Sequence, residues 1–301
     1  MTATISVAGL TRRYRDHLAL DDITVDLEDA SITGLLGRNG AGKSTLMRIL
    51  AAQEFPSAGR VRVLGENPME NDAILRRIVL VREDQLFPDF RVYQALRAAS
   101  WCYPAWDDGL ARSLVADFDL PANRLIKKLS RGMRSALGIV IGLAAQADVT
   151  LFDEPYAGLD AVARQIFYDR LLADYAAHPR TVVLSTHLID EVADLLERVV
   201  MIDRGRVVLD GPADDVRGSA TTVSGPAVVV EQFVGARQTW GRRRVGSQES
   251  VVVVGALDDG DWTRARALRL HLEPLSLQEV MVHAANRDEE RAFALEERRS
   301  A

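Results

Sequence analysis

Residues 37–44 read GRNGAGKS and match the pattern G-x-x-x-x-G-K-S in full, between a β-rich run at 31–36 and a helical run at 45–52. Glycines in such a turn let successive backbone N–H groups turn inward around phosphate oxygens, and the following helix start adds about half a positive elementary charge. Lys43 would reach the β- and γ-phosphates, and the Ser44 hydroxyl would ligate Mg²⁺. Only three lysines occur among the 37 Lys and Arg residues of the chain, so a lysine here argues against a chance turn. The stretch therefore predicts a phosphate-binding loop.

An acidic pair follows farther along the chain, in the sequence VTLFDE at 149–154. The apolar strand ends at Asp153, whose carboxylate can hold Mg²⁺, through water, beside Ser44. Glu154 is then placed to orient or activate the attacking water, a role worth on the order of 10²–10⁴ in rate. Two solvated acids at a strand end are common in isolation, and the phosphate loop upstream is what favours the catalytic interpretation.

The composition excludes several classes of protein. A net charge of −6 and a pI near 5.5 leave no global basic field for nucleic acid or an anionic membrane, so we expect no nucleic-acid partner. A single cysteine, Cys102, excludes an intramolecular disulfide and a cysteine metal cluster, which fits a reducing compartment. The start of the sequence is not typical of a signal peptide, and no apolar run reaches 18 residues. We expect a soluble chain whose membrane role, if it has one, needs a partner.

Hydrophobic patterns indicate an α/β protein. Continuous apolar runs at 76–81, 148–154 and 181–187 are separated by helical patterns, which favours a mainly parallel sheet covered on both faces. Two later stretches, at 224–233 and 249–257, are rich in β-branched residues and predict a small separate domain with several strands.

Five motifs in order make the chain resemble the ATP-binding subunit of a bacterial ABC transporter of the exporter-like (ABC-2) type. They are the phosphate loop GRNGAGKST (37–45), the signature LSRGM (129–133), the Walker B segment LFDEP (151–155), the D-loop GLD (158–160) and the switch segment STH (185–187). Their common order and spacing make the resemblance specific.

The resemblance covers roughly residues 4–211 and implies a P-loop NTPase fold. That fold has a RecA-like core, an antiparallel β subdomain and a helical subdomain, the last expected here at about 84–147. We therefore expect an ABC nucleotide-binding domain at 1–215, a small C-terminal α+β accessory domain at 216–286 and a charged tail at 287–301.

The resemblance also implies ATP and Mg²⁺ as cofactors and assigns roles to individual residues. Glu154 would be the catalytic base, and His187 would contact the γ-phosphate and help to hold the attacking water. Tyr14 would stack on adenine, since every base offers a π face. A lone histidine or a half-buried strand tyrosine also has structural uses, and those alternatives stay open. The residues implied to contact ATP are Tyr14, Gly37, Arg38, Asn39, Gly40, Ala41, Gly42, Lys43, Ser44, Thr45, Ser130, Gly132 and Asp160. The residues implied to hold the metal are Ser44, Asp153 and Glu83.

Two segments depart from the family pattern. Glu83 stands where the family has the glutamine that links magnesium and water to the helical subdomain, and Gln85 follows closely, so the residue that serves this role is open. Arg131 and Met133 replace the usual glycine and glutamine of the signature. Arg131 is either a substitute phosphate donor or a solvated flank.

The signature implies a second subunit. Ser130 can cap the helix that follows it or turn its hydroxyl to a γ-phosphate, and Gly132 permits close backbone approach. In the family this helix end meets ATP bound to the other subunit, which implies a homodimer or heterodimer about a two-fold axis with two ATP molecules between the subunits. Asp160 would act as the D-loop acid, and its position also suits an N-cap.

The resemblance predicts an ATP-hydrolysing subunit, cytoplasmic and peripheral on the inner face of the membrane, that drives a separate integral-membrane permease. Trp101, Tyr103 and Trp106 are candidate permease contacts, with a place in the core as the alternative. The segment LEPLSLQEVMVH at 272–283 looks like the end of exporter-type subunits and favours export. Two other classes stay open: a soluble ABC-type ATPase of translation or DNA repair, and an ATP-binding regulator that does not hydrolyse.

Overall fold

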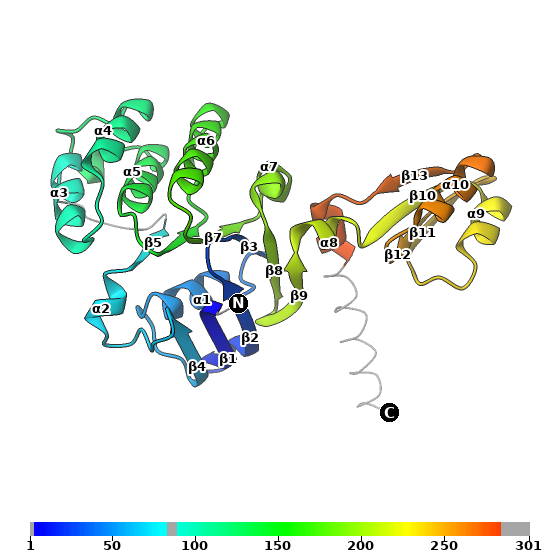
Figure 1. Ribbon diagram of the computed structural model, residues 1–301, viewed down its shortest axis with the longest axis horizontal. Helices are drawn as coiled ribbons and strands as arrows, with labels where there is room; N and C mark the ends of the chain where they lie inside the picture. Colours follow the sequence, from blue (N-terminus) through cyan, green and yellow to red (C-terminus); the bar gives the residue numbers. More distant parts are fainter. Residues whose placement is uncertain (1–2, 83–88, 284–301) are drawn as a thin grey trace. The chain divides into compact units, whose positions relative to one another are not determined.

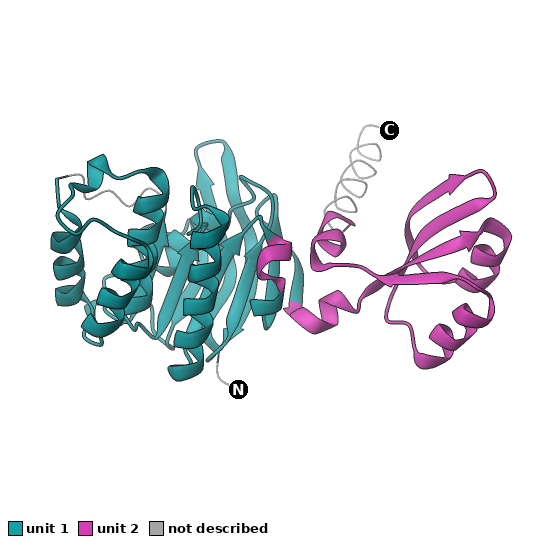
Figure 2. Cartoon of the chain, turned by 90° about the horizontal axis from the view of Figure 1, so that it is seen from above, with its two compact units in different colours: residues 1–188, 194–210 teal, residues 189–193, 211–301 magenta. Residues whose placement is uncertain are grey.

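The chain forms two units, and each is built around its own β-sheet (Figure 2). The computed structural model describes residues 3–82 and 89–283. The first unit comprises residues 1–188 and 194–210, and the second comprises 189–193 and 211–301.

A six-stranded sheet in the order β5-β6-β7-β3-β8-β9 organises the first unit. Its first five strands run parallel, and β9 follows β8 through a tight turn at Arg204 and Gly205, both with positive φ. Every residue of β3, β6 and β7 is buried, as expected of strands covered on both faces. The parallel α/β prediction is confirmed. The strands are β3 (Ile32–Leu36), β5 (Ile78–Arg82), β6 (Val149–Asp153), β7 (Thr181–Thr186), β8 (Arg198–Asp203) and β9 (Arg206–Pro212).

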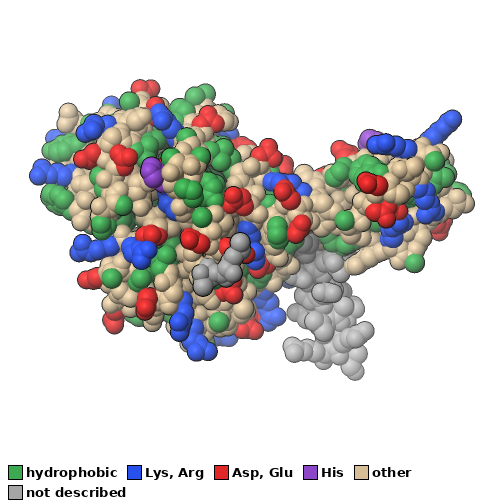
Figure 3. Space-filling view, viewed as in Figure 1, with side chains coloured by type: hydrophobic (Ala, Val, Ile, Leu, Met, Phe, Trp, Pro, Cys, Tyr) green, Lys and Arg blue, Asp and Glu red, His purple; other side chains and the backbone are tan. Residues whose placement is uncertain are grey.

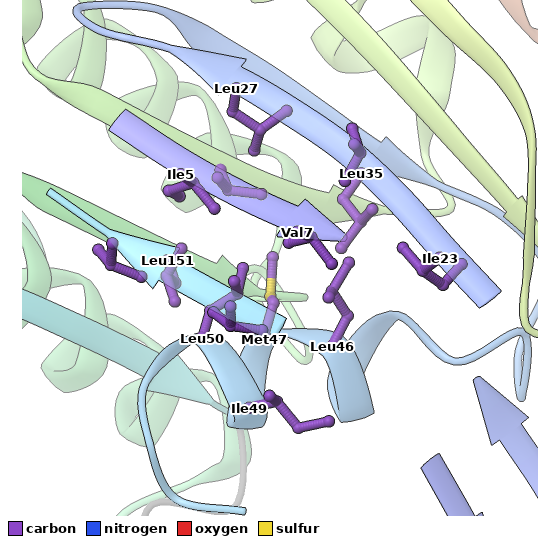
Figure 4. Close-up of a cluster of buried hydrophobic side chains, with 14 of the residues drawn as sticks. Ile5, Val7, Ile23, Leu27, Leu35, Leu46, Met47, Ile49, Leu50 and Leu151 are labelled. Carbon is purple, nitrogen blue, oxygen red and sulfur yellow. The ribbon is translucent and has the colours of Figure 1, made fainter. Parts of the chain in front are cut away.

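A three-stranded antiparallel sheet adjoins the helix that follows the phosphate loop. It has the order β2-β1-β4 and consists of β1 (Ala3–Tyr14), β2 (His17–Glu28) and β4 (Ala58–Val63). Helix α1 (Lys43–Leu50) belongs to one buried cluster with Ile5 of β1 and Leu151 of β6, and Figure 4 shows Met47 of α1 among them. Each fully buried large apolar side chain contributes about 1.5–3 kcal/mol, so this core holds the start of α1 firmly in place.

Helices account for most of the described residues between 89 and 147. Helices α3, α4 and α5 lie together in Figure 1, and α5 also packs against β5, β6 and α6. Fourteen residues make α5 the longest of these three, and its side chains from Ser135 to Ala144 are buried. The helices of the first unit are α1, already given, α2 (Asp72–Leu75), α3 (Val92–Cys102), α4 (Asp108–Asp117), α5 (Arg131–Ala144) and α6 (Ala161–Ala177).

The second unit is an antiparallel sheet in the order β11-β12-β10-β13 with helices packed on it. Its core includes Val223, Phe233 and Val251. The strands are β10 (Ala220–Pro226), β11 (Thr239–Val245), β12 (Gln248–Val254) and β13 (His271–Pro274). The helices are α7 (Ile189–Val192), α8 (Ala213–Arg217), α9 (Ala227–Val234) and α10 (Asp259–Ala267).

One expectation for the second unit was wrong. The valine-rich stretch 224–233 was expected to form a strand, but its larger part is helix α9, which begins directly after Pro226. Val230, Phe233 and Val234 are spaced three and four residues apart, so the helix buries all three side chains against the sheet. Tertiary packing therefore overrides the β propensity of the valines.

The described surface mixes charge signs. On the face drawn in Figure 3, acidic and basic side chains are interspersed, with apolar side chains exposed between them. Trp101 in α3 and Val162 in α6 are about 70% exposed. Across residues 3–82 and 89–283, no helix has both the length and the apolar character needed to cross a bilayer.

Candidate functional site

Three neighbouring strands of the six-stranded sheet bring the candidate site together at their carboxyl ends. Strand β3 leads into the phosphate loop, β6 ends at Asp153, and β7 ends at Thr186, just before His187. The order β6-β7-β3 and the register, with Leu36 opposite Thr186 and Asp153 opposite Ser185, place these ends side by side. Ligands of open α/β sheets bind at this edge.

The phosphate loop ends in a helix start that lacks a side-chain cap. Gly42 is the N-cap of α1, with φ of 113°, and a Cβ there would lie 2.6 Å from the carbonyl oxygen of Ala19. Only glycine fits a position that combines this φ with so close a backbone. Among the described residues, no side chain caps α1, and its first turn carries no acid. The first N–H groups of α1 can therefore bind an anion.

Lys43 is the buried cation of this loop. Its Nζ donates to the carbonyl oxygens of Gly37 at 2.7 Å and Arg38 at 3.1 Å, and its side chain is 5% exposed. Burial lowers the pKa of Lys43, while the carboxylates of Glu154 and Asp153 oppose that shift. A poorly hydrated ammonium with three donors interacts strongly with a phosphate that replaces water beside it.

A cleft of about 320 Å³ joins the phosphate loop to Tyr14 at the end of β1. The residues that line it are Tyr14, His17, Ala19, Asn39, Gly40, Gly42, Lys43, Ser44, Thr45 and Glu154. Eight of these ten carry a predicted role; His17 and Ala19 do not. The fold thus gathers into one cleft the aromatic, the loop and the acid that the sequence placed far apart.

Glu154 lies between the loop lysine and the switch histidine. Its Oε2 is 3.2 Å from Nδ1 of His187, and its Oε1 is 4.0 Å from Nζ of Lys43. Its backbone has φ of 47°, which is uncommon for a residue with a Cβ and is concentrated at functional sites. The backbone N–H of Glu154 donates to Ser185 Oγ at 3.0 Å, so β7 helps to hold this conformation. The carboxylate can accept a proton from a water held between His187 and a phosphate.

Asp153 offers an oxygen ligand beside the loop. Its Oδ1 accepts from Ser185 Oγ at 2.8 Å, and the residue is 8% exposed. The hydroxyl of Ser44 and the carboxylate of Asp153 are the hard oxygen donors that Mg²⁺ prefers. No group of three or more His, Cys, Asp or Glu side chains in the described part of the chain could hold a metal by itself. Mg²⁺ is usually bound through one or two carboxylates together with waters and substrate phosphates. Glu83 and Gln85 lie outside the described residues.

Sequence reasoning missed a buried tyrosine that holds the switch segment. The hydroxyl of Tyr156 donates to Thr186 Oγ1 at 2.5 Å and accepts from the backbone N–H of His187 at 3.1 Å. Thr186 Oγ1 also accepts from the N–H of Leu188. Burial raises the pKa of Tyr156 to about 12, so its proton stays available for donation. No local pattern identifies Tyr156, because its partners are 30 or more residues away and are set by the β6–β7 pairing.

The signature residues occupy a different surface of the first unit. Ser130, Gly132 and Asp160 line a groove of about 320 Å³, and none of them is among the described residues that line the cleft. Ser130 caps α5 by accepting from the N–H of Met133 at 3.2 Å, and Asp160 caps α6 by accepting from Ala163 at 2.8 Å. The predicted ATP contacts are therefore split between two surfaces of one chain.

The start of α5 also packs against the 157–158 segment of its own chain. A Cβ on Gly132 would lie 2.4 Å from the carbonyl oxygen of Gly158, and Ser135 Oγ donates to the carbonyl oxygen of Ala157 at 2.6 Å. The close approach that Gly132 permits is thus already used within the chain. Arg131 is exposed and its aliphatic stem covers Gly158, a position compatible with both roles considered for its guanidinium.

Comparisons with known proteins show which family and which fold the chain matches. The model of the ABC transporter family matches residues 20–157. The chain is 31% identical over 224 residues to the Nod factor export ATP-binding protein I of Cupriavidus metallidurans, covering 70% of this chain and 72% of that protein. It is 34% identical over 230 residues to the daunorubicin/doxorubicin resistance ATP-binding protein DrrA of Streptomyces peucetius, covering 72% and 68%. Its fold matches a dimeric ATP-binding cassette in a post-hydrolysis state with ADP and Pi bound, with a TM-score of 0.62 and 21% identity over 69% of this chain and 98% of that chain.

Proposed function

The chain belongs to the ABC transporter family as an ATP-binding ATPase subunit, and from this premise we propose that it drives a separate membrane-embedded permease in an export system. The observation that carries the mechanism is the placement of the Glu154 carboxylate between Lys43 and His187 in one cleft. Export is supported by the names of the two relatives, one a Nod factor export protein and the other a drug resistance protein.

In phosphoryl transfer to water, some residues of the cleft bind ATP and others position and deprotonate the water. The N–H groups of residues 37–44 and the Lys43 ammonium bind the phosphates, and Tyr14 stacks on the base. His187 holds the attacking water near the γ-phosphate, and the Glu154 carboxylate takes its proton. Ser44 and Asp153 would hold Mg²⁺, which would supply positive charge that offsets the charge of the phosphates.

Two copies complete each ATP site. Among the described residues, the groove that contains Ser130 and Gly132 shares no lining residue with the cleft, so the two surfaces would contact one nucleotide from different chains. In a two-fold dimer, the groove of each subunit covers the cleft of the other, so both surfaces contact ATP at once. ATP then favours the closed pair, since it contacts both subunits only when they are together. The dimeric form of the related cassette supports this arrangement.

The surface around α3 is the proposed contact with the permease, through which the subunit associates with the membrane. A groove of about 460 Å³ is lined there by Trp101, Trp106 and neighbouring residues of α3 and α4. Trp101 is 71% exposed, whereas Trp106 is half-buried and donates from Nε1 to Asp108 at 2.8 Å. Tyr103 is half-buried, and burial raises its pKa to about 12.

Phosphate release from ATP tests this proposal. The purified chain should release phosphate from MgATP in steady state, and vesicles that contain its cognate permease should stimulate that rate and bind the chain. Trp101→Ala should abolish the stimulation and leave the basal rate unchanged. Basal hydrolysis that does not respond to any permease encoded beside this gene would contradict the transport role. Absence of hydrolysis would favour the alternative that the chain is an ATP-binding regulator.

A further inference from the structure

A charged cluster surrounds the hydroxyl of Tyr14, and Glu54 is at its centre. Glu54 Oε1 accepts from the Tyr14 hydroxyl and from Arg12 Nε, the latter at 2.8 Å, while Oε2 is 3.3 Å from Arg48 Nε. The Glu54 side chain is 13% exposed. An unpaired carboxylate buried to this extent would be costly, so Glu54 depends on its two hydrogen-bond donors, Arg12 and Tyr14, and on the ion pair with Arg48.

The backbone holds Glu54 against the strand that carries Tyr14. The N–H of Gln53 donates to the carbonyl oxygen of Arg48 at 2.8 Å, which ties the segment to the end of α1. The N–H of Ser57 donates to the carbonyl oxygen of Thr11 at 2.8 Å, and Ser57 Oγ accepts from the N–H of Arg13 at 3.0 Å. Glu54 is therefore fixed from both sides and can act as a rigid anchor.

The two arginines connect this anchor to the ring and to the phosphate loop. The guanidinium carbon of Arg12 lies 4.6 Å from the centroid of the Tyr14 ring, so it covers one ring face. Among the described residues, Tyr14 lines the cleft and Arg12 does not, so the ring face opposite Arg12 is the one on which we place the base. Arg48 NH2 donates to Thr45 Oγ1 at 3.3 Å, and Thr45 lies in the wall of the cleft next to Ser44.

We propose that Glu54 is a positioning residue that fixes the Tyr14 ring, through its hydroxyl, as the platform on which the nucleobase of ATP stacks. The inference rests on the proposed function and adds to it a residue that makes no contact with the nucleotide. A ring held by a rigid carboxylate loses little rotational freedom when the base binds, so less of the stacking free energy is spent on ordering it. Arg12 and Arg48 hold the carboxylate in turn.

A platform role for Glu54 and an ordinary surface ion pair predict different effects on stability and on nucleotide affinity. A structural pair would change stability alone, whereas a platform changes the affinity for the base and leaves the affinity for the triphosphate intact. Glu54→Gln and Tyr14→Phe each remove the charged hydrogen bond and keep the ring. If both act through the same bond, the double variant should be no weaker than either single variant.

The experiment compares MgATP with Mg-tripolyphosphate, which offers the same phosphates without a base. In the full-length protein, Glu54→Gln and Tyr14→Phe should each raise KM for ATP about three- to tenfold with kcat within about twofold. The inhibition constant for tripolyphosphate should stay as in the wild type, which also shows that the variants fold. Asp148→Asn is the matched control, because it removes a carboxylate paired to Arg77 at 2.8 Å, at the start of β6. It should change neither value.

The outcomes separate the inference from the proposed function. An unchanged KM for ATP in Glu54→Gln, with the wild type active, would overturn the platform role. Equal weakening of ATP and tripolyphosphate would overturn it as well, because Glu54 would then act on the phosphate loop through Arg48. If the effects of Glu54→Gln and Tyr14→Phe on KM for ATP add in the double variant, the two residues do not act through one shared hydrogen bond. A wild type that binds no MgATP would instead disprove the proposed function.

Discussion

Two helix starts in the first unit, those of α1 and α5, are predicted to bind the same kind of ligand and are built differently. The start of α1 has Gly42 as its cap, without a side-chain bond, and Lys43 supplies a buried positive charge beside it. The start of α5 is capped by its own Ser130 and packs on Gly158. The first leaves its N–H groups for a phosphate, while at the second the N–H of Met133 already donates to Ser130 of the same chain.

This difference explains how one chain can carry two unequal parts of an ATP site. A serine hydroxyl can accept from a backbone N–H and still donate its own proton, so Ser130 need not give up its cap to contact a phosphate. The α5 surface nevertheless has no lysine comparable to Lys43 among the described residues that line its groove. The α1 cleft should therefore bind nucleotide by itself, and the α5 groove should add affinity only when a partner presents ATP.

The largest expected effect separates chemistry from binding in the α1 cleft. Glu154→Gln should lower kcat by a factor on the order of 10²–10⁴, because the amide cannot take the proton of the attacking water. ATP binding should persist, since Lys43 and the loop remain, and the ATP-bound dimer should accumulate. Phosphate release and size-exclusion chromatography with ATP measure the two effects, with the exposed Glu66→Gln as control. Unchanged hydrolysis would remove Glu154 from its assigned role.

A smaller effect should come from the tyrosine that supports the cleft. Tyr156→Phe removes the acceptor of the His187 N–H and the donor to Thr186 Oγ1, which keeps its bond from the N–H of Leu188, at a cost of about 1–3 kcal/mol. We expect kcat to fall roughly tenfold as the histidine loses its fixed position, with the Kd for ATP unchanged.

Tyr175→Phe provides the matched control for that variant. Its hydroxyl donates to the carbonyl oxygen of Ala30 at 2.6 Å and is 3.0 Å from Glu197, near the amino end of β3. It should lower the melting temperature and leave kcat unchanged. An equal fall in kcat for both variants would mean that Tyr156 acts through general stability alone.

The smallest expected effect concerns the α5 surface. Gly132→Ala places a methyl group 2.4 Å from the Gly158 carbonyl oxygen and should destabilise the fold by about 1–3 kcal/mol as α5 shifts. ATP binding by the separate chain should be retained, while the ATP-dependent dimer should weaken severalfold. Gly211→Ala, where a Cβ meets no atom within 4 Å, is the control for thermal unfolding. Full dimerisation in Gly132→Ala would show that the groove does not face the partner's nucleotide.

The sequence predicted those parts of the molecule that contiguous residues determine. The loop at 37–44 and the apolar strands at 149–153 and 181–186 are examples, since glycine spacing and continuous hydrophobic runs are local properties. It failed at 227–234, where four valines favour a strand in isolation and the sheet beneath them favours a helix. The assigned roles of Tyr14, Glu154 and His187 stay predictions, although the fold brings their side chains to one edge of the sheet.

The sequence by itself thus determined the family, the phosphate loop and the acids at the end of β6, because each depends on neighbours along the chain. Only the tertiary structure decided which residues support them. Ser185 reaches Asp153, Tyr156 reaches Thr186, and Glu54 reaches Tyr14 across 30 to 40 residues of sequence. The physical reason is that such contacts are fixed by strand order and register, and no local preference of the chain records which strand will lie beside which.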